Sequence, residues 1–440
     1  MKKNRTIIIV GGGLAGCEAA YQISKFGINA ELYEMRPETK SPAHKTSNLG
    51  ELVCSNSLKS DSLDNASGIL KREMEYLDSI VIKTAYESKV PAGKALAVDR
   101  EIFSQMLTNK IEKNSLIKIF REEVKKLPSA AENLLILASG PLTSDSLSKD
   151  ISSLTGSKHL YFYDSISPII GSESIDYSKT FKASRYEVDS EGDYINCPLN
   201  RQQYYELVKD LIEGEKIETH HFEKQIYFEA CMPVEAICER GEDTLRFGPM
   251  KPVGLIDPKE GKRPFAVLQL RTENKEETMY NMVGFQTKLR YPEQRRVFRK
   301  IPGLENAEFL RYGSIHRNTY INSPELLNSD LSLKSNNNIY FAGQITGVEG
   351  YVESAAMGII AGINTSRKLL GLKTIKISNE TAIGSLIEYI TTANKKSFQP
   401  ININFGLFPE INKKMNKSDK RELIANRSFE SLSNYKPYTQ

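Results

Sequence analysis

Two cysteines, Cys54 and Cys231, lie in segments whose composition is typical of loops. These segments, GELVCSNSLKS and FEACMPVEAICERG, contain Ser, Asn, Gly or Pro near the thiol, and loops often carry functional groups. A thiolate is a strong nucleophile and can also exchange a proton, so two loop cysteines can serve covalent catalysis. The alternative is that both are small buried apolar residues, the usual role of a lone cysteine. We expect that role for Cys17, Cys197 and Cys238.

A glycine-rich turn near the N-terminus, GGGLAG, matches the G-x-G-x-x-G pattern of dinucleotide-binding proteins. It follows a β-branched strand, 6–10, and opens a helical segment. The glycines permit a tight turn, close approach of a pyrophosphate and close packing of helix on strand. A second strand, 30–34, ends in an acid that can bind ribose hydroxyls. The expected nucleotide contacts are Gly11, Gly12, Gly13, Leu14, Ala15, Gly16 and Glu34.

A second glycine-rich segment, AGQITGVEG at 342–350, follows a buried-strand pattern and precedes a helix of small residues, 351–369. A split flavin domain has this layout, because its first βαβ unit holds the ADP half and a late strand–helix turn approaches the flavin. The late helix N-terminus can stabilise negative charge on a reduced flavin. The acid after the second strand favours FAD or NAD over NADP, and no second complete G-x-G-x-x-G is present. FAD is therefore the expected cofactor.

The chain is expected to be an α/β protein, with a Rossmann-type FAD-binding domain split in sequence by a mixed α+β insertion domain. Further buried-strand patterns occur at 134–138 and 339–342, on either side of a region with alternating, aromatic-rich segments such as 265–270. We expect residues 1–145 and 325–440 to form the FAD-binding domain, and residues 146–324 the insertion.

Composition excludes several classes of protein. The 440 residues are 40% hydrophobic and 26% charged, with a net charge of +4, which is typical of a globular protein and does not by itself indicate nucleic-acid binding. No apolar run is long enough to span a membrane, and the apolar run at 7–10 is too short for a signal peptide, so we expect a cytoplasmic protein. No Cys or His spacing suggests zinc, and no metal is expected.

Basic residues concentrate in KLRYPEQRRVFRK, 288–300. This stretch is either a solvated surface or a site that contacts RNA phosphates. On the second reading the candidate RNA-binding residues are Arg290, Arg295, Arg296 and Arg299. His316, in the polar segment YGSIHRNTYINSP, has either a structural hydrogen-bonding role or a role in stacking on a flat ring.

Together these motifs resemble one family, the bacterial folate- and FAD-dependent tRNA (uracil-5-)-methyltransferases. The similar segments include GGGLAGCEAAYQ, ELVCSNSLKS, PAGKALAVDREIFS, FEACMPVEAICERG, FGPMKPVGL, YGSIHRNTYINSP and FAGQITGVEGYVESAA. They extend from residue 5 to about residue 410, almost the whole chain. One departure is Ser139, where the family usually has threonine, and the hydroxyl is retained.

The resemblance implies transfer of a one-carbon unit from 5,10-methylenetetrahydrofolate to C5 of the T-loop uridine of tRNA, with FADH₂ as reductant and NADPH or NADH reducing the flavin. Uracil C5 becomes nucleophilic once a thiolate adds to C6, and a base must later remove the C5 proton. The family uses two cysteines that match Cys231, which we assign as nucleophile, and Cys54, which we assign as the proton-abstracting or flavin-side thiol. His316 is expected to stack on the folate pterin. The family positions near FAD match Asp99, Arg100, Gly343 and Gln344.

Three alternatives stay open at the level of sequence. The same chemistry can act on a uridine of 23S ribosomal RNA, with only the RNA-binding surface changed. A general FAD-dependent NAD(P)H oxidoreductase would use its cysteines structurally and would not need folate. A non-catalytic RNA-binding flavoprotein would keep FAD as a structural group. The oligomeric state has no signature in the sequence.

Overall fold

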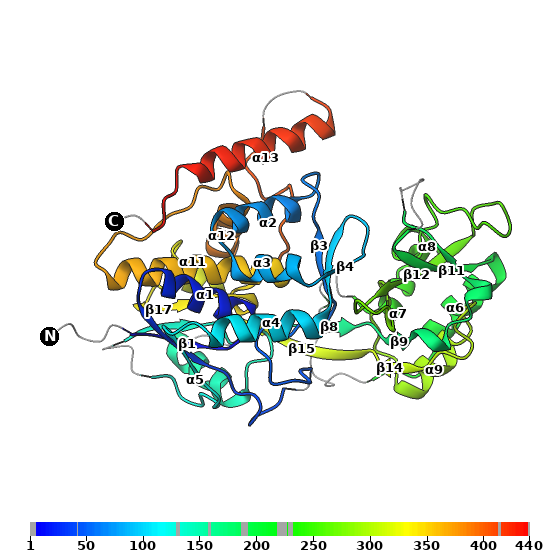
Figure 1. Cartoon of the computed structure of the whole chain (residues 1–440), viewed down its shortest axis with the longest axis horizontal. Coiled ribbons are helices and arrows are strands. Elements are labelled where there is room, and N and C mark those ends of the chain that lie inside the picture. Colours follow the sequence, from blue (N-terminus) through cyan, green and yellow to red (C-terminus); the bar gives the residue numbers. More distant parts are fainter. Residues whose placement is uncertain are drawn as a thin grey trace.

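The computed structural model describes residues 6–41, 43–128, 133–156, 160–185, 192–217, 227, 232–411 and 415–438. Two bodies lie side by side, and a ribbon of two strands, β8 (Leu160–Ile166) and β15 (Ser314–Tyr320), runs between them (Figure 1). The N-terminal and C-terminal parts of the chain together form the first body, and the middle of the chain forms the second.

The first body is built on a six-stranded sheet of order β16-β17-β7-β1-β2-β6. All of its pairings are parallel except that of β16 with β17. Because β1 pairs with both β2 and β7, the strand order reverses beside β1, and ligands bind at such switch points in open α/β sheets. The strands span Thr6–Val10 (β1), Asn29–Tyr33 (β2), Ile117–Phe120 (β6), Leu134–Leu137 (β7), Ser332–Leu333 (β16) and Asn336–Phe341 (β17).

Both faces of this sheet are buried, as the continuous apolar strands predict. Ile7 and Ile9 of β1 belong to one hydrophobic core, and Ile8 and Val10 belong to another on the opposite face. The first core includes residues of α1 (Leu14–Lys25), α2 (Ala66–Tyr76), α3 (Ile80–Glu87), α4 (Arg100–Glu112), α11 (Tyr351–Leu369), α12 (Ala382–Thr392) and α13 (Lys417–Ser433). The second includes residues of α5 (Asp145–Thr155) and α10 (Ser323–Leu326).

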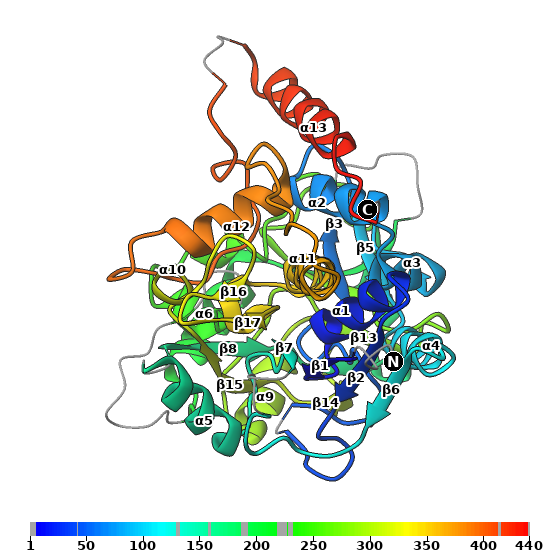
Figure 2. The same cartoon turned by 90° about the vertical axis from the view of Figure 1, so that its left-hand side faces the viewer.

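Helix α11 packs directly against α1, and Figure 2 shows the two helices side by side. A Cβ atom built on Gly358 would lie 2.2 Å from the carbonyl oxygen of Ala15, and one on Gly362 would lie 2.7 Å from that of Ala19. The small residues of α11 therefore let two backbones approach closely. This contact attaches the C-terminal part of the chain to the nucleotide-binding turn that starts α1.

The second body is a six-stranded sheet of order β10-β11-β12-β13-β9-β14, with antiparallel pairings. Its strands span Ile169–Gly171 (β9), Phe181–Lys182 (β10), Tyr194–Leu199 (β11), Ala266–Thr272 (β12), Met279–Met282 (β13) and Phe309–Arg311 (β14). Its helices are α6 (Arg201–Glu213), α7 (Val234–Cys238), α8 (Thr244–Phe247) and α9 (Tyr291–Phe298). This body has its own hydrophobic core, in which β11 and β12 pack with α6.

A small antiparallel sheet of the first body, β3 (Ser57–Ser60), β5 (Ala95–Val98) and β4 (Lys89–Val90), lies at the boundary between the bodies. Beside it, the buried guanidinium group of Arg271 donates to the side chains of Asn56 and Ser55, both at 2.9 Å. Arg100 forms an ion pair with Glu273 at 2.6 Å. These bonds join the end of β12 to the loop that contains Cys54.

The Rossmann-type α/β fold and the mixed nature of the inserted region agree with the expectation from sequence. The expected insertion start at residue 146 falls inside α5, whose Leu147 and Ile151 pack against the first sheet. We therefore propose that the insertion begins after this helix and ends with β15. None of the helices in the described part of the chain is long and apolar enough to cross a membrane.

Candidate active site

A cavity opens where the first sheet's central strands end. Its lining includes the turn 11–15, residues 33–36 and residues 138–144, which follow β1, β2 and β7. Gly343, Gln344, Tyr351 and Ser354 complete it from the C-terminal part of the chain. The cavity thus contains most of the residues that the sequence predicts for nucleotide binding.

The three glycines of the G-x-G-x-x-G motif have different structural roles. Gly11 has φ +110°, and a Cβ atom there would lie 2.3 Å from the carbonyl oxygen of Ala138. A Cβ atom on Gly16 would lie 1.8 Å from the carbonyl oxygen of Gly11, so Gly16 permits helix–strand packing. Gly13 has φ −75°, and a Cβ atom there would meet nothing within 4 Å. Gly13 therefore borders open space at the N-terminus of α1, where main-chain N–H groups and the helix dipole favour phosphate.

Glu34 lies behind this turn. Its carboxylate accepts hydrogen bonds from the main-chain N–H of Gly12 at 3.0 Å and from Nε of Arg36 at 2.8 Å. Burial alone would raise the pKa of Glu34, but the hydrogen bonds and charge of Arg36 outweigh it and hold the pKa below its ordinary value. The carboxylate is therefore ionised at neutral pH, as an acceptor for ribose hydroxyls must be.

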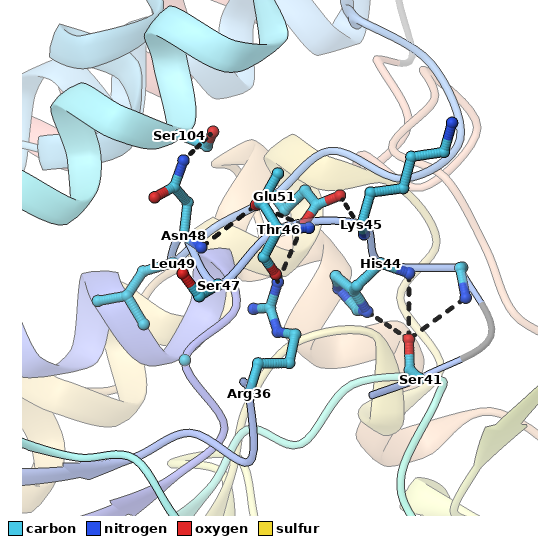
Figure 3. A network of polar contacts seen from close by, with 12 residues as sticks. Arg36, Ser41, His44, Lys45, Thr46, Ser47, Asn48, Leu49, Glu51 and Ser104 are labelled. Atoms are coloured by element: carbon cyan, nitrogen blue, oxygen red, sulfur yellow. Dashed lines mark hydrogen bonds and ion pairs between the residues drawn. The ribbon is translucent and has the colours of Figure 1, made fainter. Parts of the chain in front are cut away.

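Ser41 and the loop 43–51 lie around Arg36 (Figure 3). The guanidinium group donates to the carbonyl of Thr46 at 3.3 Å and to the carboxylate of Glu51 at 3.1 Å. Ser41 contacts Nδ1 of His44 at 2.5 Å. Burial and the charge of Arg36 lower the pKa of His44 to about 4, so its ring is neutral at pH 7.

Arg36, His44 and Glu51 all line the cavity, and sequence reasoning missed them. The one local signal is the spacing Glu34-Met35-Arg36, which places a cation two residues after the ribose-binding acid. The loop that brings His44 and Glu51 back to Arg36 has no periodic pattern. Their convergence is a tertiary feature of the site.

The late glycine-rich turn approaches the same cavity. Gly343 has φ +82°, and Nε2 of Gln344 donates to the carboxyl group of Glu349 at 2.5 Å. Burial and the nearby carboxylate of Asp164 raise the pKa of Glu349 well above its ordinary value. Glu349 is thus held beside the start of α11, whose N-cap is Gly350.

Cys54 lies between the start of α11 and strand β8 of the ribbon. Its main-chain N–H donates to the hydroxyl of Tyr351 at 2.7 Å, and its thiol contacts the carbonyl of Ser165 in β8 at 3.8 Å. Arg311 donates to the carbonyl of Val53 at 2.7 Å and Arg100 to that of Leu52 at 3.1 Å, so two guanidinium groups hold the chain just before Cys54.

His316 lies in the strand ribbon close to this cysteine. It is paired in register with Asp164 of β8, and the next residue of that strand, Ser165, contacts the Cys54 thiol. Burial and the charge of Arg311 lower the pKa of His316, so the ring is neutral at pH 7. Ser314 contacts one ring nitrogen at 2.9 Å. The ribbon thus places His316 on the strand next to the residue that contacts Cys54.

Asp99 and Arg100 lie at the boundary between the bodies, outside the lining of the cavity. Asp99 caps α4 and also accepts from the main-chain N–H of Lys275 at 3.2 Å. Arg100 binds Glu273 and the carbonyl of Leu52. Asp99 and Arg100 therefore contact residues at the end of β12 and the loop that contains Cys54.

Cys231 lies outside the described residues. The segment that follows it is anchored, because the N–H of Val234 donates to the carbonyl of Gln286 at 2.7 Å. Cys17, Cys197 and Cys238 are buried, as predicted, and burial raises the pKa of each, that of Cys238 to about 12. Within the described part of the chain, no three metal-binding side chains cluster.

The four predicted RNA-binding arginines lie on and beside α9, and each has an acceptor in the protein. Arg296 pairs with Asp210 and Glu293, both at 2.7 Å, and Arg290 pairs with Glu215 at 3.0 Å. Arg295 donates to the hydroxyl of Tyr312, and Arg299 donates to the carbonyl of Ala307. An RNA phosphate would have to compete with these groups.

Comparison with known proteins agrees with this architecture. The fold is similar to that of GidA from Aquifex aeolicus, with TM-scores of 0.71 and 0.68 in two crystal forms at 18% and 17% identity. The matches cover 98% of this chain and 76% and 74% of GidA. The family model described as glucose inhibited division protein A matches residues 6–373.

The sequence relatives are much more similar. The chain is 54% identical to the methylenetetrahydrofolate--tRNA-(uracil-5-)-methyltransferase TrmFO of Citrifermentans bemidjiense, over 98% of each chain. It is 52% identical to the protein of the same name from Syntrophus aciditrophicus, over 100% of this chain and 99% of the relative. Because the identity is this high and extends over nearly the full length, the chain belongs to the TrmFO family within the broader glucose inhibited division protein A family.

Proposed function

We propose that this protein transfers a one-carbon unit from 5,10-methylenetetrahydrofolate to C5 of a uridine in the T-loop of tRNA. The observation that carries the proposal is 54% identity over nearly the full length to proteins named for this donor and this class of RNA. The arrangement of a dinucleotide-type cavity beside a cysteine held near two arginines supports it.

FAD is the cofactor that we assign to the cavity. The open space at Gly13, the free N-terminus of α1 and the ionised Glu34 suit the pyrophosphate and ribose of its ADP half. Gly343 and Gln344, in the cavity wall, would hold the flavin half. Bound FAD would supply reducing equivalents for converting the one-carbon unit to a methyl group, with NADPH or NADH as the source.

The protein's thiols carry the proposed covalent chemistry. Addition of the Cys231 thiolate to uracil C6 makes C5 enolate-like, and C5 then bonds to the methylene carbon as the bond from that carbon to N10 of the folate breaks. Cys54 removes the C5 proton, and the bond from the methylene carbon to N5 of the folate breaks. A hydride, which bound reduced FAD would supply, would convert the methylene to a methyl group as the bond between Cys231 and C6 breaks.

The position of Cys54 supports its role, because hydrogen bonds with Arg100, Arg311 and Tyr351 fix its loop beside the cavity. Neutral, flat His316, in the neighbouring ribbon, would stack on the pterin of the folate.

The defining experiment measures methylation of tRNA and of ribosomal RNA, each with and without 5,10-methylenetetrahydrofolate. We expect folate-dependent incorporation of a methyl group into tRNA. Incorporation only into ribosomal RNA would show that the substrate is a uridine of 23S ribosomal RNA and not of tRNA. NADPH oxidation that requires neither folate nor RNA, without methylation, would instead support a general oxidoreductase.

The thiol roles are tested with RNA that contains 5-fluorouridine, from which no C5 proton can be removed. Wild type and Cys54→Ala should form a complex that survives denaturing gels, and Cys231→Ala should form none. Cys238→Ala is the matched control, because this buried thiol has no assigned role and should leave the complex unchanged. If Cys54→Ala loses the complex and Cys231→Ala keeps it, the two roles are exchanged.

A further inference from the structure

A second hollow lies at the outer end of the second body, away from the nucleotide cavity. It is a groove of about 1030 Å³ between the turn 198–203, helix α8 with the loop after it, and the turn 257–263. In Figure 1, α8 and the nearby strands β11 and β12 lie on the side away from α1 and β1. The proposed flavin and thiol chemistry does not use this groove.

The groove concentrates positive charge. Seven of its lining residues are Lys or Arg, and only Asp257 and Glu260 are acidic. This local excess exceeds the net charge of +4 of the entire chain, so the positive charge is focused here. Part of it is compensated, because Lys262 pairs with Glu260 at 3.0 Å, Lys179 with Glu305 at 2.8 Å and Arg246 with Asp243 at 3.5 Å. Arg263 has no hydrogen-bonding or ion-pair partner among the described residues and is exposed.

An aromatic platform lies beside these cations. The guanidinium group of Arg246 lies 3.9 Å from the ring centroid of Phe265 and 5.4 Å from that of Phe247. Phe247 is 77% exposed, which is unusual for a large apolar side chain. An exposed aromatic ring beside arginine is suited to stacking on an unpaired base, while nearby cations bind the phosphates.

Strand β12 connects the groove to the proposed reaction centre. Phe265, immediately before this strand, lines the groove, and Arg271, near the strand's end, binds Asn56 and Ser55 beside Cys54. The six residue steps from Phe265 to Arg271, at a rise of about 3.3 Å each, separate the two sites by roughly 20 Å. A stacked nucleic-acid strand covers that length in about six nucleotides at a spacing of about 3.4 Å.

We propose that this groove is a second contact site for the RNA substrate, which binds phosphates there and stacks an unpaired base on Phe247. The contact lies about six stacked nucleotides from the uridine that reacts. This inference rests on the proposed function, because it assumes an RNA substrate. It is a different surface from α9, and it adds an exposed aromatic ring and Arg263, unpaired among the described residues, to a set of cations.

The test uses two exposed residues of the groove and full-length tRNA transcript. Arg263→Glu should weaken tRNA binding and should lower the slope of log affinity against log salt by about 0.7 to 0.9, the contribution of one phosphate contact. Phe247→Ala should weaken binding by at least about fivefold with an unchanged salt slope, because stacking releases no counterions. Lys113→Glu, an exposed charge reversal in the first body, is the control and should leave the affinity within about twofold.

A positional measurement complements the affinities. Photo-crosslinking from 4-thiouridine, placed about six nucleotides from the target, should label the peptide that contains Phe247. Unchanged affinity in both groove variants, with crosslinks elsewhere, would overturn the groove assignment while wild-type methylation kept the proposed function intact. A groove variant that raised KM for NADPH and left tRNA affinity unchanged would show that the groove binds a dinucleotide instead. Absence of RNA binding and methylation in wild type would reject the proposed function itself.

Discussion

The hydroxyl of Tyr351 accepts hydrogen bonds from the main-chain N–H groups of Cys54, at 2.7 Å, and of Ser55, at 3.2 Å. Tyr351 is the first residue of α11, almost three hundred positions later in the chain, and it also lines the nucleotide cavity. One side chain therefore joins the loop of the candidate catalytic thiol to the candidate flavin site.

Tyr351→Phe removes the acceptor of these two partly buried bonds and should lower the free energy of unfolding by about 1–3 kcal/mol. We also expect faster alkylation of Cys54 and slower methyl transfer, because the main chain at Cys54 and Ser55 loses its bonds to α11. Tyr340→Phe is the control, since that hydroxyl is buried without a hydrogen-bond partner among the described residues. Urea unfolding and thiol labelling measure both variants, and equal effects in the two would contradict the positioning role of Tyr351.

Gly13→Val should abolish flavin binding without unfolding the protein. The backbone at Gly13 has an ordinary negative φ and open space around a Cβ atom, so the valine side chain occupies the proposed pyrophosphate position. The visible absorbance of the purified protein measures occupancy, and circular dichroism measures the fold. A yellow, fully occupied variant would place the phosphates elsewhere.

Gly16→Ala should behave differently, although it alters the same motif. A methyl group at this position would lie 1.8 Å from the carbonyl oxygen of Gly11, so the helix must move away from the strand. We expect a loss of about 1–3 kcal/mol in the free energy of unfolding, measured in urea. A stable variant that had merely lost its flavin would show that this glycine serves the ligand and not the packing.

Glu18 should make stability depend on pH. Burial raises the pKa of this carboxyl group to about 7, although hydrogen bonds from Ser79 and Val81 oppose the shift. Because the folded protein retains the proton more strongly than the unfolded chain, this contribution is full below about pH 4.5 and is lost as the pH rises to about 7. Glu18→Gln removes the titration.

Glu18→Gln should reduce the difference between the unfolding free energies at pH 5 and at pH 8, by on the order of 3 kcal/mol at most. Urea unfolding at the two pH values measures it. Glu206→Gln, at an exposed position, is the control and should preserve the wild-type difference. A Glu18→Gln protein with the full wild-type pH dependence would show that this carboxyl group titrates normally.

The arginines of α9 provide a comparison with the groove. Replacing Arg290 and Arg296 together by glutamine should weaken tRNA binding less than Arg263→Glu does alone, because both are already paired with carboxylates. Binding titrations at several salt concentrations measure both. A larger loss of affinity and salt slope in the α9 variant would restore this helix as the principal RNA surface.

Local sequence determined the elements that surround the nucleotide cavity. The β-branched run 6–10, the glycines of the following turn and the small residues of 351–369 predicted β1, the start of α1 and the whole of α11. Such features can be predicted because strand burial, tight turns and helix packing depend on residues a few positions apart. Family resemblance further directed attention to Cys54 and His316.

Tertiary structure decided which of these residues meet. The contact of Tyr351 with Cys54, the loop folded around Arg36 and the groove beside Phe247 all join segments that are distant in sequence or have no periodicity. The same holds for the α9 arginines, whose charge in the sequence suggested a free basic surface. The acceptors of Arg296 and Arg290, Asp210 and Glu215, come from the end of α6 and the residues after it, so only folding shows that these two charges are paired.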